Sequence, residues 1–191
     1  MFATDLEKLL PEARAYARML CGDRELADDI VQNACLKAWN ARKSFDPNKG
    51  AFKAWMFSIT RNEFLQHLRK TKRVDCYAPS DLENILTTDC HMDRKSECSE
   101  AIRQLFTLTP EQRDVFILVV AAGYSYEEAA EICKCSIGTI KSRINRARAK
   151  LVAAIEPNDP VVETEENDLD APIQSIPELI NYVEELVRPA A

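Results

Sequence analysis

The stretch 109–151 constrains the fold of this chain most strongly, because it contains three helix starts in close succession. In "TPEQRDVFILVVAAGYSYEEAAEICKCSIGTIKSRINRARAKL", each helical pattern follows a hydroxyl residue that can cap its first turn: Thr109, Ser125 and Ser136. The sequence therefore predicts a helix, a loop around Gly123, a short second helix, a brief turn over 134–136 and a third helix to about Ala154.

The third predicted helix has an apolar stripe on one side and a polar, cationic face on the other. At 100° per residue, the stripe that would pack on the other helices consists of Ile137, Ile140, Ile144, Ala147 and Leu151. The opposite face consists of Gly138, Ser142, Asn145, Arg146 and Ala149, with Lys141, Arg143, Arg148 and Lys150 at its flanks. A short helix, a tight turn and a polar-faced helix indicate a helix-turn-helix, in which polar residues contact base edges and flanking cations neutralise phosphates.

Charge is segregated along the chain, whose formal net charge is -6. Residues 132–155 contain six bases and no acid, whereas residues 156–191 contain ten acids and one base. Residues 75–100 contain seven acids and two bases. Basic helical blocks that alternate with acidic segments often mark a nucleic-acid binder, and a solvated basic face on a helix bundle is the alternative.

Composition favours an all-α protein of the cytoplasm. Four glycines and 7% aromatic residues argue against a β fold, and runs rich in alanine, leucine, glutamate and lysine favour helices. The longest apolar run, 115–122, is too short for membrane insertion. The start "MFATDLEKLL" has no basic leader followed by an apolar stretch, so we expect a cytoplasmic location and free thiols at the seven cysteines.

No residue pattern indicates catalysis or metal binding. The cysteines of "CKC" at 133–135 and "CHMDRKSEC" at 90–98 lack the Cys-x-x-Cys spacing of tetrahedral zinc sites, so we expect small buried or incidental thiols. His67 and His91 are the only histidines, and there is no glycine-rich phosphate loop. We therefore expect no metal, no cofactor, no catalytic residue and no enzymatic activity.

Two further helices are expected in the N-terminal part. Asp23 can cap a helix that ends near Arg42, and after the loop "SFDPNKG" a second helix runs from Ala51 to about Thr71. These patterns predict an all-α chain of two small helical domains joined by a flexible, acidic linker. The predicted boundaries are 1–73 for the first domain, 74–100 for the linker, 101–155 for the second domain and 156–191 for an acidic tail.

The tail combines an acidic, proline-bearing stretch with the pattern of one short amphipathic helix, "SIPELINYVEELV". A short lone helix is marginal in water, so it needs a surface to pack on. Three arrangements remain open: the helix packs on the second domain, the helix docks on a partner protein, or the acidic stretch lies across the basic third helix and weakens DNA binding.

Two stretches resemble regions of one protein family. "DDIVQNACLKAW" followed by "AFKAWMFSITRNEFLQHLRK" resembles region two of the extracytoplasmic-function sigma factors, and the stretch 108–151 resembles their region four. The motif "EEAAEICKCSIGTIKSR" further resembles the branch that runs the general stress response of alphaproteobacteria. The resemblance implies a protein that binds core RNA polymerase, directs it to promoter DNA and is itself bound by an anti-sigma factor.

The resemblance also implies which residues bind each partner. Polymerase-binding positions fall at Asp28, Asp29, Val31, Gln32, Leu36 and Trp39. Positions at the minus-ten element fall at Ser58, Arg61 and Asn62, with the cations Arg69 and Lys70 at the end of the same helix. Positions at the minus-thirty-five element fall at Lys141, Ser142, Arg143, Asn145 and Arg146, with Arg148 beside them.

Two other functions remain open beside that of a sigma factor. A sigma-like decoy would bind an anti-sigma factor but no promoter, and a stand-alone helix-turn-helix regulator would bind duplex DNA as a dimer. The 36 residues after Ile155 are too few for the receiver domain that such decoys carry. A stand-alone regulator would not need the region-two pattern.

Overall fold

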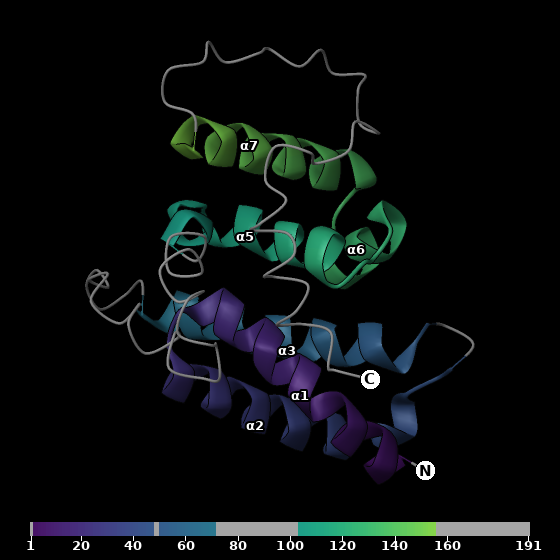
Figure 1. The fold of residues 1–191 in the computed structure, drawn as a ribbon. Helices are drawn as coiled ribbons and strands as arrows, with labels where there is room; N and C mark the ends of the chain where they lie inside the picture. Colours follow the sequence, from purple (N-terminus) through teal and green to yellow (C-terminus); the bar gives the residue numbers. More distant parts are fainter. Residues whose placement is uncertain (1, 48–49, 72–102, 156–191) are drawn as a thin grey trace. The chain divides into compact units, whose positions relative to one another are not determined.

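The computed structural model describes residues 2–47, 50–71 and 103–155, which form two compact helical units (Figure 1). Throughout these described ranges the regular structure is helical, so the predicted all-α fold is confirmed. None of their helices is both long enough and apolar enough to cross a lipid bilayer. The predicted linker over 74–100 and the tail over 156–191, with its amphipathic helix, lie outside the described residues.

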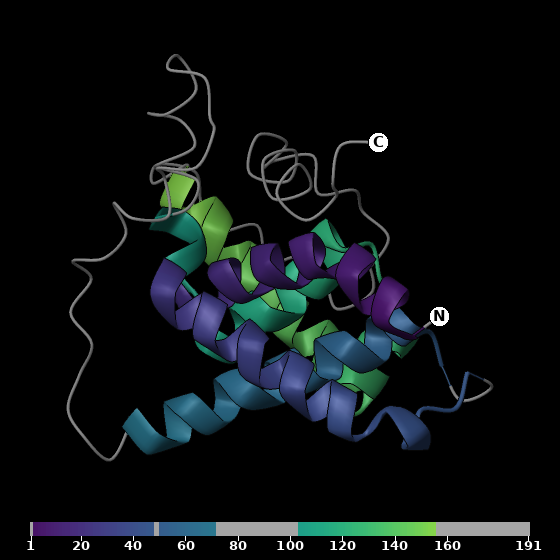
Figure 2. The ribbon, with the colours of Figure 1, turned by 90° about the horizontal axis from the view of Figure 1, so that it is seen from below.

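The first unit contains α1 (Phe2–Cys21), α2 (Arg24–Asn40), the 3-10 turn η1 (Arg42–Ser44) and α3 (Phe52–Thr71). Asp23 caps α2 as predicted, because its side chain accepts a hydrogen bond from the Leu26 amide at 2.7 Å. Figures 1 and 2 show α1, α2 and α3 packed against one another.

The three long helices of this unit enclose one apolar core. Fully buried side chains come from all three helices, and among the largest are Tyr16, Leu20, Met56 and Phe57. The rings of Tyr16 and Phe57 stack with centroids 4.6 Å apart, which joins α1 to α3. The helix α1 was not predicted from the sequence, although buried residues recur along it at helical spacing: Leu9, Ala13, Tyr16, Ala17 and Leu20.

The second unit begins with helical residues 103–107 and continues through α5 (Pro110–Phe116), η3 (Ile117–Ala121), α6 (Tyr126–Cys133) and α7 (Ile137–Ile155). Thr109 and Ser125 each form a reciprocal capping box, with Gln112 and Glu128 respectively, so these predicted helix starts are confirmed. Ser136 accepts a hydrogen bond from the Thr139 amide at 3.2 Å at the start of α7.

The segment η3 is a π-helical turn that the sequence did not predict. It continues α5 directly, and the Ala122 amide closes it by donating to the carbonyl of Ile117 at 2.9 Å. A π turn lets the chain widen within an otherwise regular helix. Its residues Ile117, Leu118, Val120 and Ala121 are buried, so the wider turn serves the packing of this unit.

The long helix α7 packs on α5 and α6 through its apolar stripe. Ile140, Ile144, Ala147 and Leu151 are fully buried, which confirms these positions of the stripe. Ile137 differs from the prediction, because its side chain is 40% exposed. It is the first residue of α7 and therefore lies before the turns that α5 and α6 cover. On the outward side of α7, Ser142, Arg146 and Lys150 are exposed within the part of the chain that the structure describes.

Candidate functional site

The outward side of α2 carries an exposed stripe that we call the α2 stripe: Asp29, Gln32, Leu36 and Trp39. These positions share one face of the helix, because they are separated by three or four residues. Leu36 is 58% exposed and Trp39 is 46% exposed, although both are large apolar side chains. Neighbouring exposed apolar residues on one face indicate a surface that another macromolecule covers.

Two of the predicted polymerase-binding residues lie beside the α2 stripe rather than on it. Val31 is buried in the core of the unit. The carboxylate of Asp28 lies between two cations of α1, 3.7 Å from Arg14 and 3.8 Å from Arg18. Both positions therefore hold α2 in place within the unit, and the structure brings together the other four predicted residues.

Trp39 belongs to a group of five aromatic rings at one end of the first unit: Phe2, Trp39, Phe45, Phe52 and Trp55. Ring centroids are 5.2 Å apart for Phe2 and Phe52 and 6.0 Å apart for Phe2 and Trp39. The guanidinium of Arg42 lies 4.8 Å from the centroid of Trp39. These contacts fix the orientation of the exposed Trp39 ring. No sequence pattern indicated the parts played by Phe2 and Phe45.

The predicted minus-ten residues lie on α3, where most of them share its outward face. Ser58, Asn62 and Arg69 follow one another at helical spacing, and Arg69 and Lys70 are exposed. The hydroxyl of Ser58 donates to the carbonyl of Trp55 at 2.7 Å, so only its oxygen lone pairs remain for a ligand. Arg61 is placed differently, because it is only 7% exposed and belongs to the interior of the unit.

An ion pair that was not predicted from the sequence joins α2 to α3. The ammonium group of Lys37 contacts the carboxylate of Glu63 and lies 3.4 Å from the amide oxygen of Gln66. The Glu63 side chain is only 11% exposed, whereas that of Lys37 is half exposed. Lys37 follows Leu36 of the α2 stripe, and Glu63 follows Asn62 on α3. The ion pair therefore links the helix turn that carries Leu36 to the helix turn that carries Asn62. No sequence pattern marks a pair whose members are 26 residues apart.

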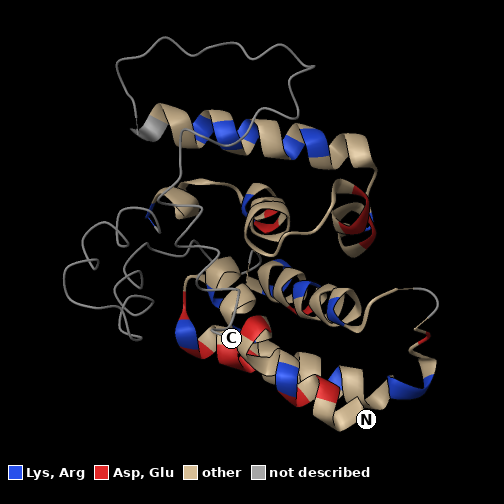
Figure 3. Ribbon diagram, turned by 45° about the vertical axis from the view of Figure 1, so that its right-hand side comes forward, with Lys and Arg blue, Asp and Glu red and all other residues tan. Residues whose placement is uncertain are grey.

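The second unit presents the predicted minus-thirty-five residues together on α7, as what we call the α7 face: Lys141, Ser142, Arg143, Asn145, Arg146 and Arg148. Ser142 and Arg146 are exposed, and the other members are partly exposed. The hydroxyl of Ser142 donates to the carbonyl of Thr139 at 3.1 Å, which again leaves its lone pairs for a ligand. In Figure 3 this helix shows basic bands and no acidic ones.

The turn before α7 holds this helix at a fixed angle to α6. Lys134 adopts the left-handed conformation with φ of 52°, and the Cys135 amide donates to the carbonyl of Ala130 at 3.1 Å. Cys133 is buried as predicted, and its thiol lies 3.7 Å from a carboxylate oxygen of Asp114. This geometry of a short helix, a tight turn and a long helix is that of a helix-turn-helix, as predicted.

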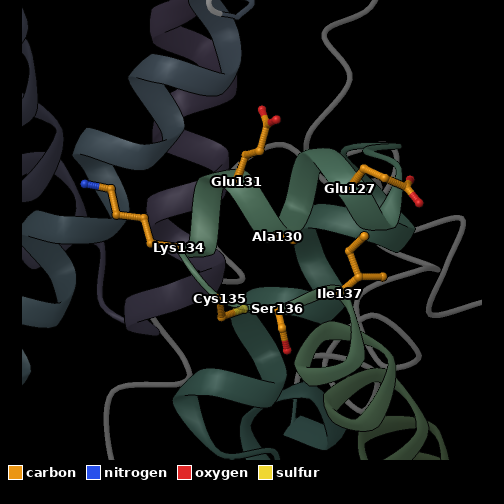
Figure 4. A pocket seen from close by; sticks show the side chains of 7 residues that line it. All are labelled: Glu127, Ala130, Glu131, Lys134, Cys135, Ser136 and Ile137. Carbon is orange, nitrogen blue, oxygen red and sulfur yellow. The ribbon is translucent and has the colours of Figure 1, made fainter.

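A shallow, open cavity of about 720 Å³ lies where α6 meets the start of α7 (Figure 4). Its lining includes the exposed Ile137 and the acids Glu127 and Glu131 of α6. The exposed cation Lys134 lines the same cavity, so both signs of charge lie at this end of α7. The cations of the α7 face begin one turn further along, at Lys141.

Comparison with protein families and known proteins agrees with this geometry. Residues 6–74 match Sigma-70 region 2, and residues 100–151 match Sigma-70 region 4. The ECF RNA polymerase sigma factor EcfG of Rhodopseudomonas palustris (strain TIE-1) is 40% identical over 151 residues, 79% of this chain and 83% of that protein. ECF RNA polymerase sigma factor SigC of Mycobacterium tuberculosis (strain CDC 1551 / Oshkosh) is 33% identical over 134 residues, 70% of this chain and 72% of that protein.

Two solved structures resemble the chain over most of its length. One is the sigma factor RpoE in complex with the anti-sigma factor NepR from Bartonella quintana. It gives a TM-score of 0.70 at 34% identity and covers 83% of this chain and 98% of that one. The other is CnrH in complex with the cytosolic domain of CnrY, with a TM-score of 0.59 at 27% identity, covering 83% of this chain and 89% of that one.

Proposed function

The chain belongs to the extracytoplasmic-function branch of the sigma-70 family, and from this premise we propose how its helical faces divide the work of starting transcription. As a sigma factor it binds core RNA polymerase and directs it to promoters, which is a task of recognition and not of catalysis. The α2 stripe contacts the polymerase, the outward face of α3 contacts the minus-ten element, and the α7 face contacts the minus-thirty-five element. The first domain ends near residue 73, the second spans 101–155, and the segments 74–100 and 156–191 serve as linker and tail.

The observation that carries this proposal is the α7 face itself. Within residues 137–155 every charged side chain is basic, while Ile140, Ile144, Ala147 and Leu151 on the opposite side are fully buried. Cations on such a helix neutralise phosphates and set its register in the major groove. Asn145 and Arg146 can then donate hydrogen bonds to base edges, which supplies sequence preference.

The α2 stripe has the composition of a protein-binding surface rather than a DNA-binding one. Leu36 and Trp39 offer apolar anchors, and Asp29 would be repelled by phosphates. The ring contacts of Trp39 with Phe2 and Arg42 hold it in one orientation before binding. A side chain that is already fixed loses little conformational entropy when a partner covers it.

The outward face of α3 suits a strand that has been separated from its partner. Extruding a base from duplex DNA costs a few kcal/mol, so the protein must offer compensating contacts. Asn62 and Ser58 supply polar groups to a flipped base, and Arg69 and Lys70 supply cations to the neighbouring phosphates. Arg61 precedes Asn62 in the chain and is buried in the unit, so we do not place it in direct contact with DNA.

Regulation by an anti-sigma factor is part of the same proposal. One similar structure holds the sigma factor RpoE with the anti-sigma factor NepR, and the other holds CnrH with the cytosolic domain of CnrY. An anti-sigma factor that covers Leu36 and Trp39 would block the polymerase site directly. We place the protein in the cytoplasm, with stress-response promoters as its targets, because of its similarity to the general-stress branch.

Run-off transcription tests the proposed function. Purified protein is mixed with core RNA polymerase and a pool of chromosomal fragments from the source organism, and transcripts are mapped. We expect a set of start sites that core polymerase alone does not use. Capture of an anti-sigma factor without new start sites would instead indicate a decoy. Duplex binding as a dimer without polymerase dependence would indicate a stand-alone regulator.

A further inference from the structure

We propose that the acidic segment 156–170 of the tail occupies the α7 face while promoter DNA is absent, and that DNA must displace it. This inference rests on the proposed function of the α7 face in DNA binding. The segment follows α7 directly in the chain and contains seven acids and no base. It is therefore the most concentrated negative charge that the sequence places next to that helix.

The cations of the α7 face can bind this negatively charged segment. Among the residues that the structure describes, no ion pair involves Lys141, Arg143, Arg146 or Arg148. The first unit differs, because its cations Arg14, Lys37 and Lys53 each pair with a carboxylate of a neighbouring helix. Four unpaired cations on one helix face attract an anionic segment, and at low salt this attraction is strongest.

The length of the chain allows the segment to reach these cations. Lys141 lies about 21 Å from the end of α7 at Ile155, at a rise of 1.5 Å per residue. An extended chain covers that distance in about seven residues. The acids of the cluster Glu163, Glu165, Glu166, Asp168 and Asp170 begin eight residues after Ile155, so they can lie opposite any cation from Lys141 to Arg148.

The charges around α7 also direct the segment to this part of the helix. The cavity beside Ile137 is lined by two acids, Glu127 and Glu131, and one cation, Lys134, so the start of α7 offers the segment no excess of positive charge (Figure 4). Lys150 already donates to the carbonyl of Thr107. The remaining cations, 141–148, are those that we assign to the minus-thirty-five element. Segment and DNA thus compete for the same side chains.

Each ion pair between the segment and α7 is weak, but the segment competes with DNA effectively because it is tethered to the same helix. An exposed ion pair contributes little by itself, yet a tether raises the effective concentration of the segment to the millimolar range. We expect the segment to lower the affinity for duplex DNA about tenfold at low salt. The effect is not larger because DNA offers more phosphates than the segment offers carboxylates, and because DNA binding releases counterions. Salt must weaken this effect, because screening acts on every pair.

The test uses the full chain and two variants with the same change of charge. The tail variant replaces the cluster with amides: E163Q/E165Q/E166Q/D168N/D170N. The matched control makes five such replacements in the linker: D81N/E83Q/D89N/D93N/E97Q. Affinity for a duplex that contains the minus-thirty-five element is measured at about 50 and about 300 mM KCl. Separately, the amide shifts of α7 are compared by NMR without DNA, which suits a chain of 21.7 kDa.

We expect the tail variant to bind the duplex about tenfold more tightly at the lower salt and the linker control to change less than about twofold. The amides of 141–148 should shift in the tail variant only, and both differences should shrink at the higher salt. Equal gains in both variants would show an effect of net charge and would overturn the inference. Unchanged α7 amides in the tail variant would overturn it as well. If the α7 amides shifted in the tail variant but none of the three proteins bound the duplex, the contact between the segment and α7 would be supported. The proposed function of the α7 face in DNA binding would then be refuted.

Discussion

Lys37 illustrates how much can depend on one residue of a small helical unit. It is the cation beside the poorly exposed Glu63 carboxylate, and it also lies within 3.4 Å of Gln66. Withdrawing a carboxylate from water is costly unless a cation or hydrogen bonds compensate for the lost hydration. Because Lys37 neighbours Leu36 and Glu63 neighbours Asn62, the pair fixes the register between the α2 stripe and the outward face of α3.

Replacing Lys37 with methionine should therefore destabilise the first unit. We expect K37M to lower the free energy of unfolding by about 1–2 kcal/mol, because the Glu63 carboxylate loses its cation while methionine keeps the side-chain length. Urea denaturation measures this change. The reversed pair K37E/E63K should recover part of the loss. A K37M protein as stable as the wild type would show that the pair contributes nothing.

Arg146 and Lys141 should matter for promoter DNA and not for polymerase. We expect R146A/K141A to weaken binding to the minus-thirty-five duplex by about ten- to a hundredfold. The plot of the logarithm of the binding constant against the logarithm of the salt concentration should also become less steep, by about one unit of slope for each lost phosphate contact. Affinity titrations at several salt concentrations measure both effects. The control K8A removes an exposed cation of α1. If R146A/K141A instead abolished polymerase binding, the proposed division between the two units would be wrong.

The candidate site could be predicted at the level of faces but not of every side chain. The spacing of Gln32, Leu36 and Trp39 places them on one side of a helix, whatever the helix packs on. Whether Val31 of α2 and Arg61 of α3 are exposed or buried depends on where neighbouring helices cover them, and local spacing does not show that. The Lys37–Glu63 pair was missed for the same reason, since only the packing of α2 on α3 brings its members together.

Helix starts were the most predictable elements, because a cap is a local interaction. The Ser125 hydroxyl accepts from the Glu128 amide at 3.2 Å, and the Glu128 carboxylate accepts from the Ser125 amide at 2.9 Å. Both bonds form within four consecutive residues. The π turn η3 was not predicted, because tertiary packing rather than local sequence determines it. The helix α1 was not predicted either: its apolar residues keep helical spacing, but Pro11 within it disfavours a continuous helix.

Loss of the Ser125 cap should destabilise the second unit alone. We expect S125A to reduce its stability by about 1 kcal/mol, because the first turn of α6 loses a partner for its backbone amide. S125D is the matched variant and should retain most of the stability, since aspartate is an equally good cap. Hydrogen exchange of α6 amides measures the local effect. Equal exchange in S125A and the wild type would contradict the expected role of the cap.

The aromatic group makes the start of α1 important for the whole first unit. Phe2 contacts Trp39, Phe52 and Trp55, so it links the first residues of the chain to α2 and α3. We expect F2A to lower the free energy of unfolding by about 1–3 kcal/mol and to increase the mobility of the Trp39 ring. Thermal unfolding and tryptophan fluorescence measure these changes. The control T4A alters an exposed position of α1, and a similar loss in T4A would argue against the ring contacts.

At the scale of the whole molecule, the two units present surfaces of opposite character. The α2 stripe is apolar and slightly acidic, whereas the α7 face is basic and hydrogen-bonding. A protein partner and a nucleic-acid partner can therefore be bound at the same time without competing for the same side chains. Two moderate interactions on one chain reinforce each other, because the second one becomes intramolecular after the first has formed.

The α2 stripe provides the test of this division that disturbs the fold least. Because Leu36 is 58% exposed, L36A should change the stability by less than about 0.5 kcal/mol. If Leu36 is an anchor of the polymerase interface, its truncation should weaken polymerase binding by about ten- to a hundredfold. Binding to the minus-thirty-five duplex in the absence of polymerase should not change, since the α7 face belongs to the other unit.

The matched control for L36A is I137A, which shortens an aliphatic side chain that is 40% exposed in the second unit. Polymerase affinity, duplex affinity and run-off transcription are measured for both variants and the wild type. We expect L36A to lose transcription in proportion to its lost polymerase affinity and to regain it at higher protein concentration, because each loaded polymerase still finds the promoter. If L36A bound polymerase as tightly as the wild type, the α2 stripe would not be the docking surface, and the exposure of Leu36 and Trp39 would need another partner to explain it.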